Sequence, residues 1–163
     1  MIKQIFNIVA IILLAIIIGV LVYFFYPESQ GPGETMLVKV FFSNTYEDPN
    51  ALHCDKVYFS QREIPKSQSI AQDSIKELLK GVNQTEKEAG FFTNINEGVK
   101  IQGFSIENRV AKIDFNDKLN EEVAGSCRVQ AIRAQITETL KQFPEIDDVV
   151  ISINDNEEDI LQP

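Results

Sequence analysis

The sequence predicts an α+β domain in which two helices pack on one face of a roughly five-stranded mixed sheet, preceded by a single transmembrane helix. Three observations carry this prediction. The chain opens with a long uncharged apolar run, and two later segments repeat apolar residues at helical spacing. Several shorter segments are rich in β-branched and aromatic residues, as strands are. Because each helix has one apolar face, helices layered on a sheet follow.

The apolar run extends from Ile5 to Tyr26, with no charge and one strongly polar residue, Asn7. A helix needs about 20 residues to cross a hydrocarbon core of roughly 30 Å. A cleaved secretory signal is the alternative, but it has a shorter apolar region followed by small residues at the cut site. Bulky residues follow this run. We therefore expect residues 1–26 to form a short cytoplasmic tail and an uncleaved membrane anchor.

The distribution of charge predicts the membrane topology, and the net charge argues against two classes of partner. Lys3 is the only charged side chain before Glu28. The positive-inside tendency therefore predicts a single-pass protein of the cell membrane, with a cytoplasmic N-terminus and an extracytoplasmic C-terminal domain. The formal net charge is −9. This acidity argues against nucleic acid, which is bound by neutralising its phosphates, and against an anionic lipid surface.

The first elements after the anchor are a linker and two strands. Residues 27–36 are rich in Pro and Gly, which is typical of a linker. Residues 37–43 and 55–61 have the β-branched and aromatic composition of strands. Pro65 is expected to end the second extended segment.

The first helix is predicted from about residue 69 to residue 82. Its apolar residues recur at helical spacing, and Ser69 with Gln72 forms a capping-box pattern. Gly81 is placed to end the helix. Residues 83–96 are predicted to be a loop.

A hairpin, a second helix and a last strand complete the domain. Residues 99–107 and 109–115 form the hairpin arms, and a bulge at Gly103 reconciles a shift in the apolar phase. Ser126 is expected to cap a helix that continues to residue 142. Residues 149–153 alternate as a strand. The domain is therefore predicted to span residues 37–155, followed by a solvated acidic tail, residues 156–163.

The order of these segments resembles the GerMN domain, an extracytoplasmic module named from spore-germination proteins. The matching pieces are VKVFFSN, IAQDSIKELLKGV, EAGFFTNINEGVKIQGFSIENRVAKIDFNDKL and VQAIRAQITETLKQFPEIDDVVISIND. The resemblance implies an α+β fold similar to ring-building motifs of secretion-like assemblies, an envelope location and a non-catalytic interaction role. The chain departs from fuller members in having no lipid-attachment Cys, no second domain, and Val82 where the family usually places Pro.

Cys54 and Cys127 are the only cysteines, 73 positions apart. In an extracytoplasmic, non-reducing space an even count favours a disulfide, which we expect here. The alternative is a pair of buried free thiols, which pack as small hydrophobic side chains.

We expect no catalytic, cofactor-binding or metal-binding residue. Ser126-Cys127-Arg128 resembles the end of the L,D-transpeptidase signature, but the His that this chemistry places before Gly-Cys is absent. The sole histidine, His53, and the two cysteines lack zinc-ligand spacing. The acidic run 155–159 lacks the glycine and spacing of a calcium loop.

These observations predict a membrane-tethered, envelope-facing contact module whose partner is another envelope protein or a second copy of the chain. Two alternatives stay open. One is a receptor for a small cell-wall ligand, which would need a pocket with convergent polar groups. The other, less favoured, is an envelope enzyme, which would place a nucleophile and a base within hydrogen-bond reach.

Overall fold

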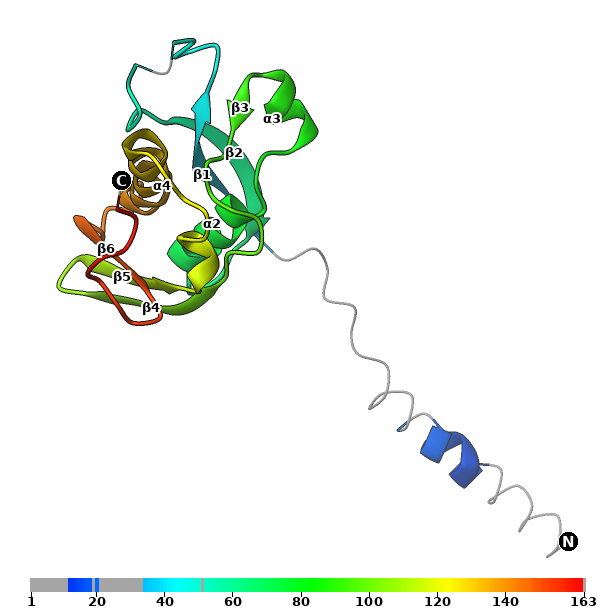
Figure 1. Ribbon diagram of the computed structural model, residues 1–163. Helices are drawn as coiled ribbons and strands as arrows, with labels where there is room; N and C mark the ends of the chain where they lie inside the picture. The colour runs from blue at the N-terminus through cyan, green and yellow to red at the C-terminus, as the bar shows by residue number, and fades with distance from the viewer. Residues whose placement is uncertain (1–11, 19, 21–33, 51, 163) are drawn as a thin grey trace, which may run out of the picture. The chain divides into compact units, whose positions relative to one another are not determined.

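The computed structural model describes residues 12–18, 20, 34–50 and 52–162 (Figure 1). The chain divides into two compact units, Met1–Gly33 and Glu34–Pro163. Residues 12–18 and 20 of the first unit are helical. The second unit contains every named strand and carries the core, and its fold is described below.

The first sheet contains three strands in the order β2-β1-β3, all antiparallel. They are β1 (Thr35–Asn44), β2 (Tyr58–Pro65) and β3 (Phe91–Phe92). Successive side chains of a strand point to opposite faces. Val38, Val40 and Phe42 accordingly line a buried inner face of β1.

The second sheet has the order β4-β5-β6 and comprises β4 (Ile101–Glu107), β5 (Val110–Phe115) and β6 (Asp148–Ile153). A two-residue turn at Asn108 and Arg109 joins β4 to β5, and both residues have positive φ. This is the backbone twist that two-residue hairpins favour. β5 and β6 are parallel, so a crossover must connect them, and α4 (Ser126–Lys141) supplies it.

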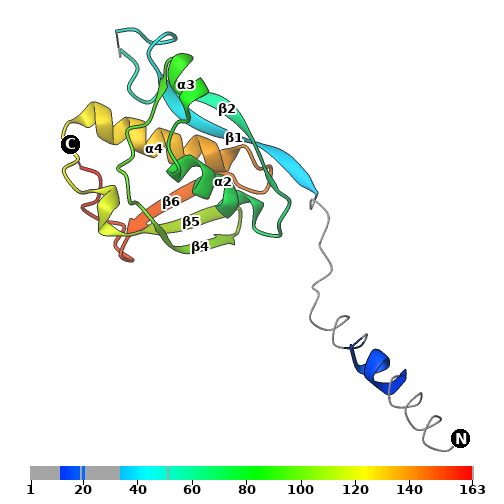
Figure 2. The ribbon, with the colours of Figure 1, turned by 90° about the vertical axis from the view of Figure 1, so that its right-hand side faces the viewer.

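α2 and α4 lie between the two sheets, as the two views in Figures 1 and 2 show, and α3 lies beside β3. α2 covers Ile70–Leu79, α3 covers only Gln84–Glu88, and a 3₁₀ turn, η1, covers Asp117–Leu119. α4 buries two adjacent stripes of residues. One is the apolar stripe, with Ile132 and Ile136 fully buried, and the other contains the polar residues Gln135 and Thr139. A helix buried on two sides suits a layer between sheets.

The predicted fold class is α+β with a single roughly five-stranded sheet, and the single sheet is wrong. The physical reason lies at the edge of β1 that faces α4. The Lys39 backbone N–H donates to Gln142 Oε1 at 2.8 Å, and Gln142 Nε2 donates to the Lys39 carbonyl at 2.7 Å. The Phe41 N–H donates to Thr139 Oγ1 at 3.1 Å. Side chains at the end of α4 thus occupy the positions that a further strand would need, and β4, β5 and β6 form a separate sheet.

The transmembrane helix in the predicted fold class is also not found. Within residues 12–18, 20, 34–50 and 52–162, no helix is both long and apolar enough to cross a membrane. Of the expected anchor, Ile5 to Tyr26, only residues 12–18 and 20 belong to this described part.

Most of the individual elements are confirmed, and several bounds and details differ. β2 covers Tyr58–Pro65 instead of the predicted residues 55–61. The bulge falls between Ile101 and Gly103, as expected. α3 and β3 lie in the predicted loop 83–96. The Ser69 side chain makes no capping hydrogen bond, and Gly125 precedes α4 in place of Ser126. The C-terminal segment is not wholly solvated, because Ile160 and Leu161 are buried in the core.

Candidate interaction surface

The structure joins Cys54 and Cys127 in a disulfide, with their Cα atoms 4.9 Å apart. Cys54 lies in the long connection between β1 and β2, and Cys127 lies in the first turn of α4. The bond therefore fastens this connection to the N-terminus of α4.

His53 and Asp48 lie in the same connection. The backbone N–H groups of His53 and Leu52 both donate to the Asp48 carboxylate. The hydrogen bond from the His53 backbone, above all, lowers the pKa of Asp48. His53 Nδ1 is 4.0 Å from Asp48 Oδ2. Asp48 thus acts as an anchor for its own loop.

A small cavity of about 160 Å³ lies beside the disulfide, lined in part by His53, Phe92 and Asn94. Pockets that enclose a drug-sized ligand measure roughly 300–1,000 Å³. This cavity is below that range. Among the described residues no group of three or more His, Cys, Asp or Glu side chains is arranged to hold a metal ion.

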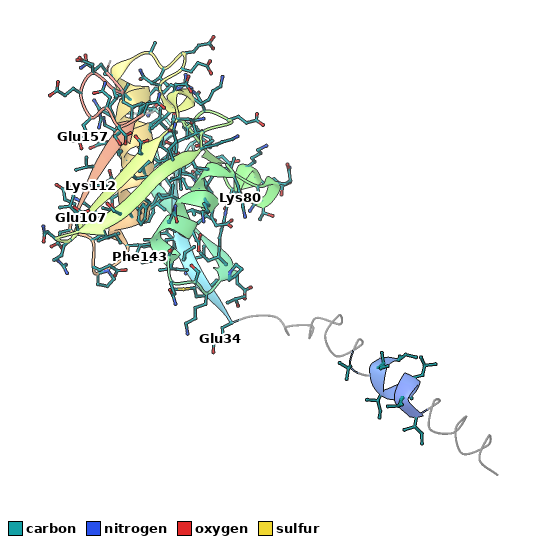
Figure 3. The ribbon with its side chains drawn as sticks, turned by 90° about the horizontal axis from the view of Figure 1, so that it is seen from below. Glu34, Lys80, Glu107, Lys112, Phe143 and Glu157 are labelled. Carbon is teal, nitrogen blue, oxygen red and sulfur yellow. A yellow bond between two sulfur atoms is a disulfide. The ribbon has the colours of Figure 1, made fainter. Side chains whose placement is uncertain are left out.

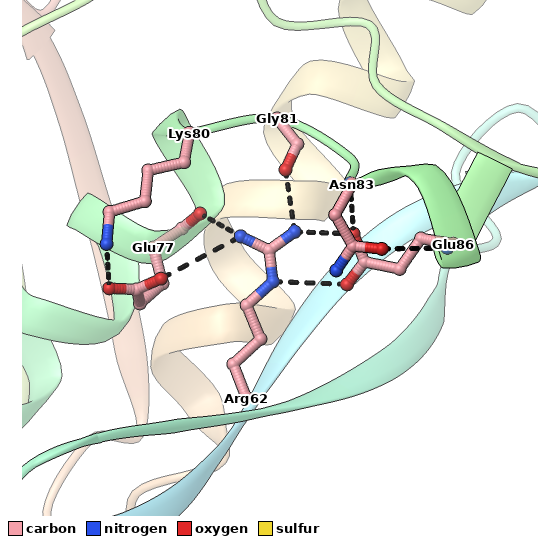
Figure 4. Close-up of polar contacts among 6 residues, drawn as sticks. All are labelled: Arg62, Glu77, Lys80, Gly81, Asn83 and Glu86. Atoms are coloured by element: carbon pink, nitrogen blue, oxygen red, sulfur yellow. Dashed lines mark hydrogen bonds and ion pairs between the residues drawn. The ribbon is translucent and has the colours of Figure 1, made fainter.

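The most elaborate polar cluster centres on Arg62 of β2 (Figure 4). Its guanidinium donates to both carboxylate oxygens of Glu86, at 3.1 and 2.5 Å. It also donates to the backbone carbonyls of Glu77 and Gly81, at 2.7 and 2.6 Å. Those carbonyls lie at the C-terminal end of α2, where a helix leaves carbonyl groups without intrahelical donors. Arg62 thus joins β2, α2 and α3.

Glu86 has a second structural task. Its side chain accepts the Asn83 N–H at 2.7 Å, and the Asn83 side chain accepts the Glu86 N–H at 2.9 Å, which makes a capping box for α3. Burial raises the pKa of Glu86, but the hydrogen bonds from Arg62 and Asn83 outweigh burial and hold that pKa below its ordinary value. The carboxylate is fully engaged, so this cluster is a structural site.

The side of the first sheet that faces away from the helices is exposed. We call it the outer face, and it is formed by alternate residues of β1 and β2. Its members are Leu37, Lys39, Phe41, Phe59, Gln61 and Glu63. Leu37 is 63% exposed and Phe59 is 51% exposed. Large apolar side chains gathered on one exposed face are typical of protein-interaction sites.

The outer face has an aromatic centre with a cation beside it. Phe41 and Phe59 are directly opposite in the β1–β2 register, with ring centroids 6.2 Å apart. The Lys39 ammonium lies 4.9 Å from the centroid of the Phe59 ring. Aromatic side chains are enriched at protein interfaces, where a few of them supply most of the binding energy. This combination makes the outer face the candidate functional site.

The outward side of the second sheet has a different character. Lys112 and Glu107, labelled in Figure 3, form an ion pair there at 3.7 Å. Both side chains are about half exposed or more. An exposed ion pair of this kind contributes little binding or folding energy. The two sheets therefore present one aromatic and one charged exterior.

The outer face has no clear signal in the sequence. In β1 both alternating sets are apolar, since Leu37 and Phe41 interleave with Val38 and Val40. Alternation alone therefore does not identify which set is buried. Lys39 is the one charged residue within β1, and it lies on the exposed side. Its position could have indicated which alternating set faces solvent.

Two small sheets around a helical layer, with a loop fastened to a helix by a disulfide, define the second unit as an α+β domain. The family model described as "Germane: Sporulation and spore germination" matches residues 22–159. The chain belongs to this family, so the resemblance to the GerMN domain is confirmed.

Solved structures agree on the fold. The tandem GerMN domains of the sporulation protein GerM from Bacillus subtilis align with a TM-score of 0.55 at 21% identity, over 76% of this chain and 41% of that one. The first GerMN domain of the same protein gives 0.54 at 20% identity, over 75% and 85%. The chain thus spans less than half of the tandem-domain protein. A search of curated proteins returns no match.

Proposed function

We propose that this chain is an extracytoplasmic, non-catalytic contact module that binds another envelope protein or a second copy of itself through its outer face. The observation that carries this proposal is the aromatic pair on the outer face, half-buried Phe41 and exposed Phe59, with exposed Leu37 on the same face. Burying each large apolar side chain in a contact contributes about 1.5–3 kcal/mol. Membership of a sporulation- and germination-type family supports the same role.

The disulfide supports the extracytoplasmic location. Disulfides persist in oxidising compartments and are rare in the cytosol. The test is to treat the protein, as isolated from its cells, with an alkylating reagent in the absence of reductant and to weigh it intact. We expect no alkylation of Cys54 or Cys127. Alkylation of both would overturn the location.

The contact role is tested by photocrosslinking in the cells that make the full-length chain. A photoreactive amino acid replaces Leu37, the most exposed apolar residue of the outer face. The control places it at Lys112, on the outward side of the second sheet. We expect a discrete protein adduct from position 37 and none from position 112. Equal labelling from the two positions, or none from position 37, counts against the proposal.

A further inference from the structure

The two edges of the β1–β2 pair differ in a way that points to a partner. Thr139 of α4 and Gln142, the residue that follows α4, form hydrogen bonds with the backbone groups of Phe41 and Lys39 on the edge of β1 that does not pair with β2. Natural proteins block exposed strand edges because unpaired backbone groups template further strands. The α4 side chains are such a block. No comparable block covers β2 in the part of the chain that the structure describes.

The backbone direction in β2 follows from the same hydrogen bonds. The backbone N–H groups of Lys39 and Phe41 point toward α4. The backbone groups of Val40, which lies between them, therefore point toward β2, where Val40 is opposite Ser60. The alternate residues of β2, Phe59, Gln61 and Glu63, therefore direct their N–H and C=O groups away from β1. Within residues 34–50 and 52–162, no hydrogen bond to these backbone groups is found.

The open edge of β2 is also regular. Its pairing with β1 runs without a bulge from Pro65 to Tyr58, and Phe59, Gln61 and Glu63 are all exposed. Bulges and edge prolines are common protections of an edge, and the only proline here is Pro65 at the end of the strand. A strand of this length can accept a partner strand along its middle.

We propose that the partner is β2 of a second copy, paired antiparallel with Gln61 opposite Gln61 of that copy. This inference rests on the proposed contact function and adds to it a second contact, along the edge of β2 beside the outer face. The first sheets of the two copies would become one continuous six-stranded sheet about a twofold axis. A twofold contact uses the same patch on both copies, and an antiparallel strand pair meets this condition.

Charge selects this register. With Gln61 opposite Gln61, Phe59 of each copy lies opposite Glu63 of the other. The Lys39 ammonium lies over Phe59, so it faces the incoming carboxylate, and the twofold axis makes this contact twice. A register centred on Glu63 would instead place two like charges directly opposite, which is destabilising. The chosen register also pairs all three outward-facing residues.

A zero-length carbodiimide crosslink tests the contact on the full-length chain. This reagent joins a lysine amine to a carboxylate only when they touch. We expect a covalent dimer. Lys39 and Glu63 are also diagonal neighbours within one chain, so unlabelled and ¹⁵N-labelled chains are mixed before the reaction, and peptide mapping should find a mixed-label amide between Lys39 of one copy and Glu63 of the other. Absence of a dimer, or a dimer linked only elsewhere, overturns the proposal.

Backbone pairing is tested at Gln61. Proline there removes an N–H that faces away from β1, so the β1–β2 hydrogen bonds stay intact. We expect Gln61→Pro to abolish the crosslinked dimer, and Gln61→Thr, which keeps the N–H, to retain it. Circular dichroism confirms that both variants are folded. A folded Gln61→Pro variant that still forms the dimer overturns strand pairing.

The charge contact is tested by mixing variants. Lys39→Glu alone and Glu63→Lys alone each place like charges across the contact, so each should lose the dimer. Mixed together, they restore an attractive pair at both positions, and a heterodimer should appear. No recovery on mixing overturns the register. If the Leu37 photocrosslink captures a different protein while no dimer forms, the contact function of the outer face stands and only strand pairing with a second copy is excluded.

Discussion

Removing the Arg62 guanidinium should destabilise the domain strongly, and Arg62→Met is the variant that shows it. Methionine keeps much of the apolar stem but no donor. Glu86, whose side chain is 6% exposed, would be left as a buried carboxylate. The carbonyls of Glu77 and Gly81 would each lose a donor. Breaking a buried ion pair by removing one partner costs about 3–5 kcal/mol.

The expected loss at neutral pH is about 3 kcal/mol, because Glu86 keeps the Asn83 N–H as a donor. In a domain of this size that lowers Tm by roughly 10 °C. The assay is thermal unfolding of the full-length chain followed by circular dichroism. Lys66→Met is the matched control, because it removes a cation from an exposed pair with Glu34 at 2.7 Å. It should change stability by less than about 1 kcal/mol.

The pH dependence gives the sharper test. The pKa of Glu86 is held below its ordinary value in the folded state, so its contribution to stability is present above the unfolded pKa and is lost as pH falls. The difference in the free energy of unfolding between Arg62→Met and the wild type should therefore become smaller below about pH 4. Glu86→Gln added to Arg62→Met keeps the capping box and removes the stranded charge. That double variant should recover part of the loss at pH 7. A double variant as unstable as Arg62→Met, or a cost that does not change with pH, would refute the reasoning.

Three further predictions concern other parts of the domain. Replacing Cys54 and Cys127 with Ser should cost up to about 4 kcal/mol, since the bond closes a 73-residue separation, and reductant should destabilise only the wild type in unfolding assays. Gln142→Ala should release both backbone groups of Lys39, costing about 1–2 kcal/mol, and amide hydrogen exchange at Lys39 should accelerate while that at Val40 does not. The hydrogen bonds from Lys76 and Ser67 lower the pKa of Asp73, so Asp73 stabilises the fold above its unfolded pKa. Asp73→Asn should therefore flatten the fall in Tm on acidification below about pH 4, and an unchanged slope would contradict this.

Local patterns in the sequence predicted most of the elements because each depends on neighbouring residues. The alternation in residues 109–115 and the bulge near Gly103 are examples, and both are found. The short α3 was missed, although Asn83 and Glu86 have the spacing of a capping box. Five residues are too few to show helical periodicity, so the cap was its only signal.

The division into two sheets was not predictable in the same way. It depends on Gln142 and Thr139 contacting the backbone of a strand about 100 positions earlier. In the sequence these residues read as the polar face of a helix, and Gln135 beside them reads the same way. In the structure Gln135 and Thr139 are fully buried. Polar side chains that pair with distant backbone groups carry no periodic signal of their own.

The buried polar residues indicate where mutations should affect folding and where they should affect association. Arg62 completes the end of α2, and Gln142 and Thr139 complete the edge of β1, so each satisfies backbone groups inside the domain. Changes there alter the free energy of unfolding. Phe59 and Gln61 lie on an edge and a face that lack such partners within the described residues, so changes there should alter association while Tm stays near that of the wild type. If a variant of the outer face loses association only because it unfolds, that residue belongs with Arg62, Gln142 and Thr139, whose changes alter the free energy of unfolding.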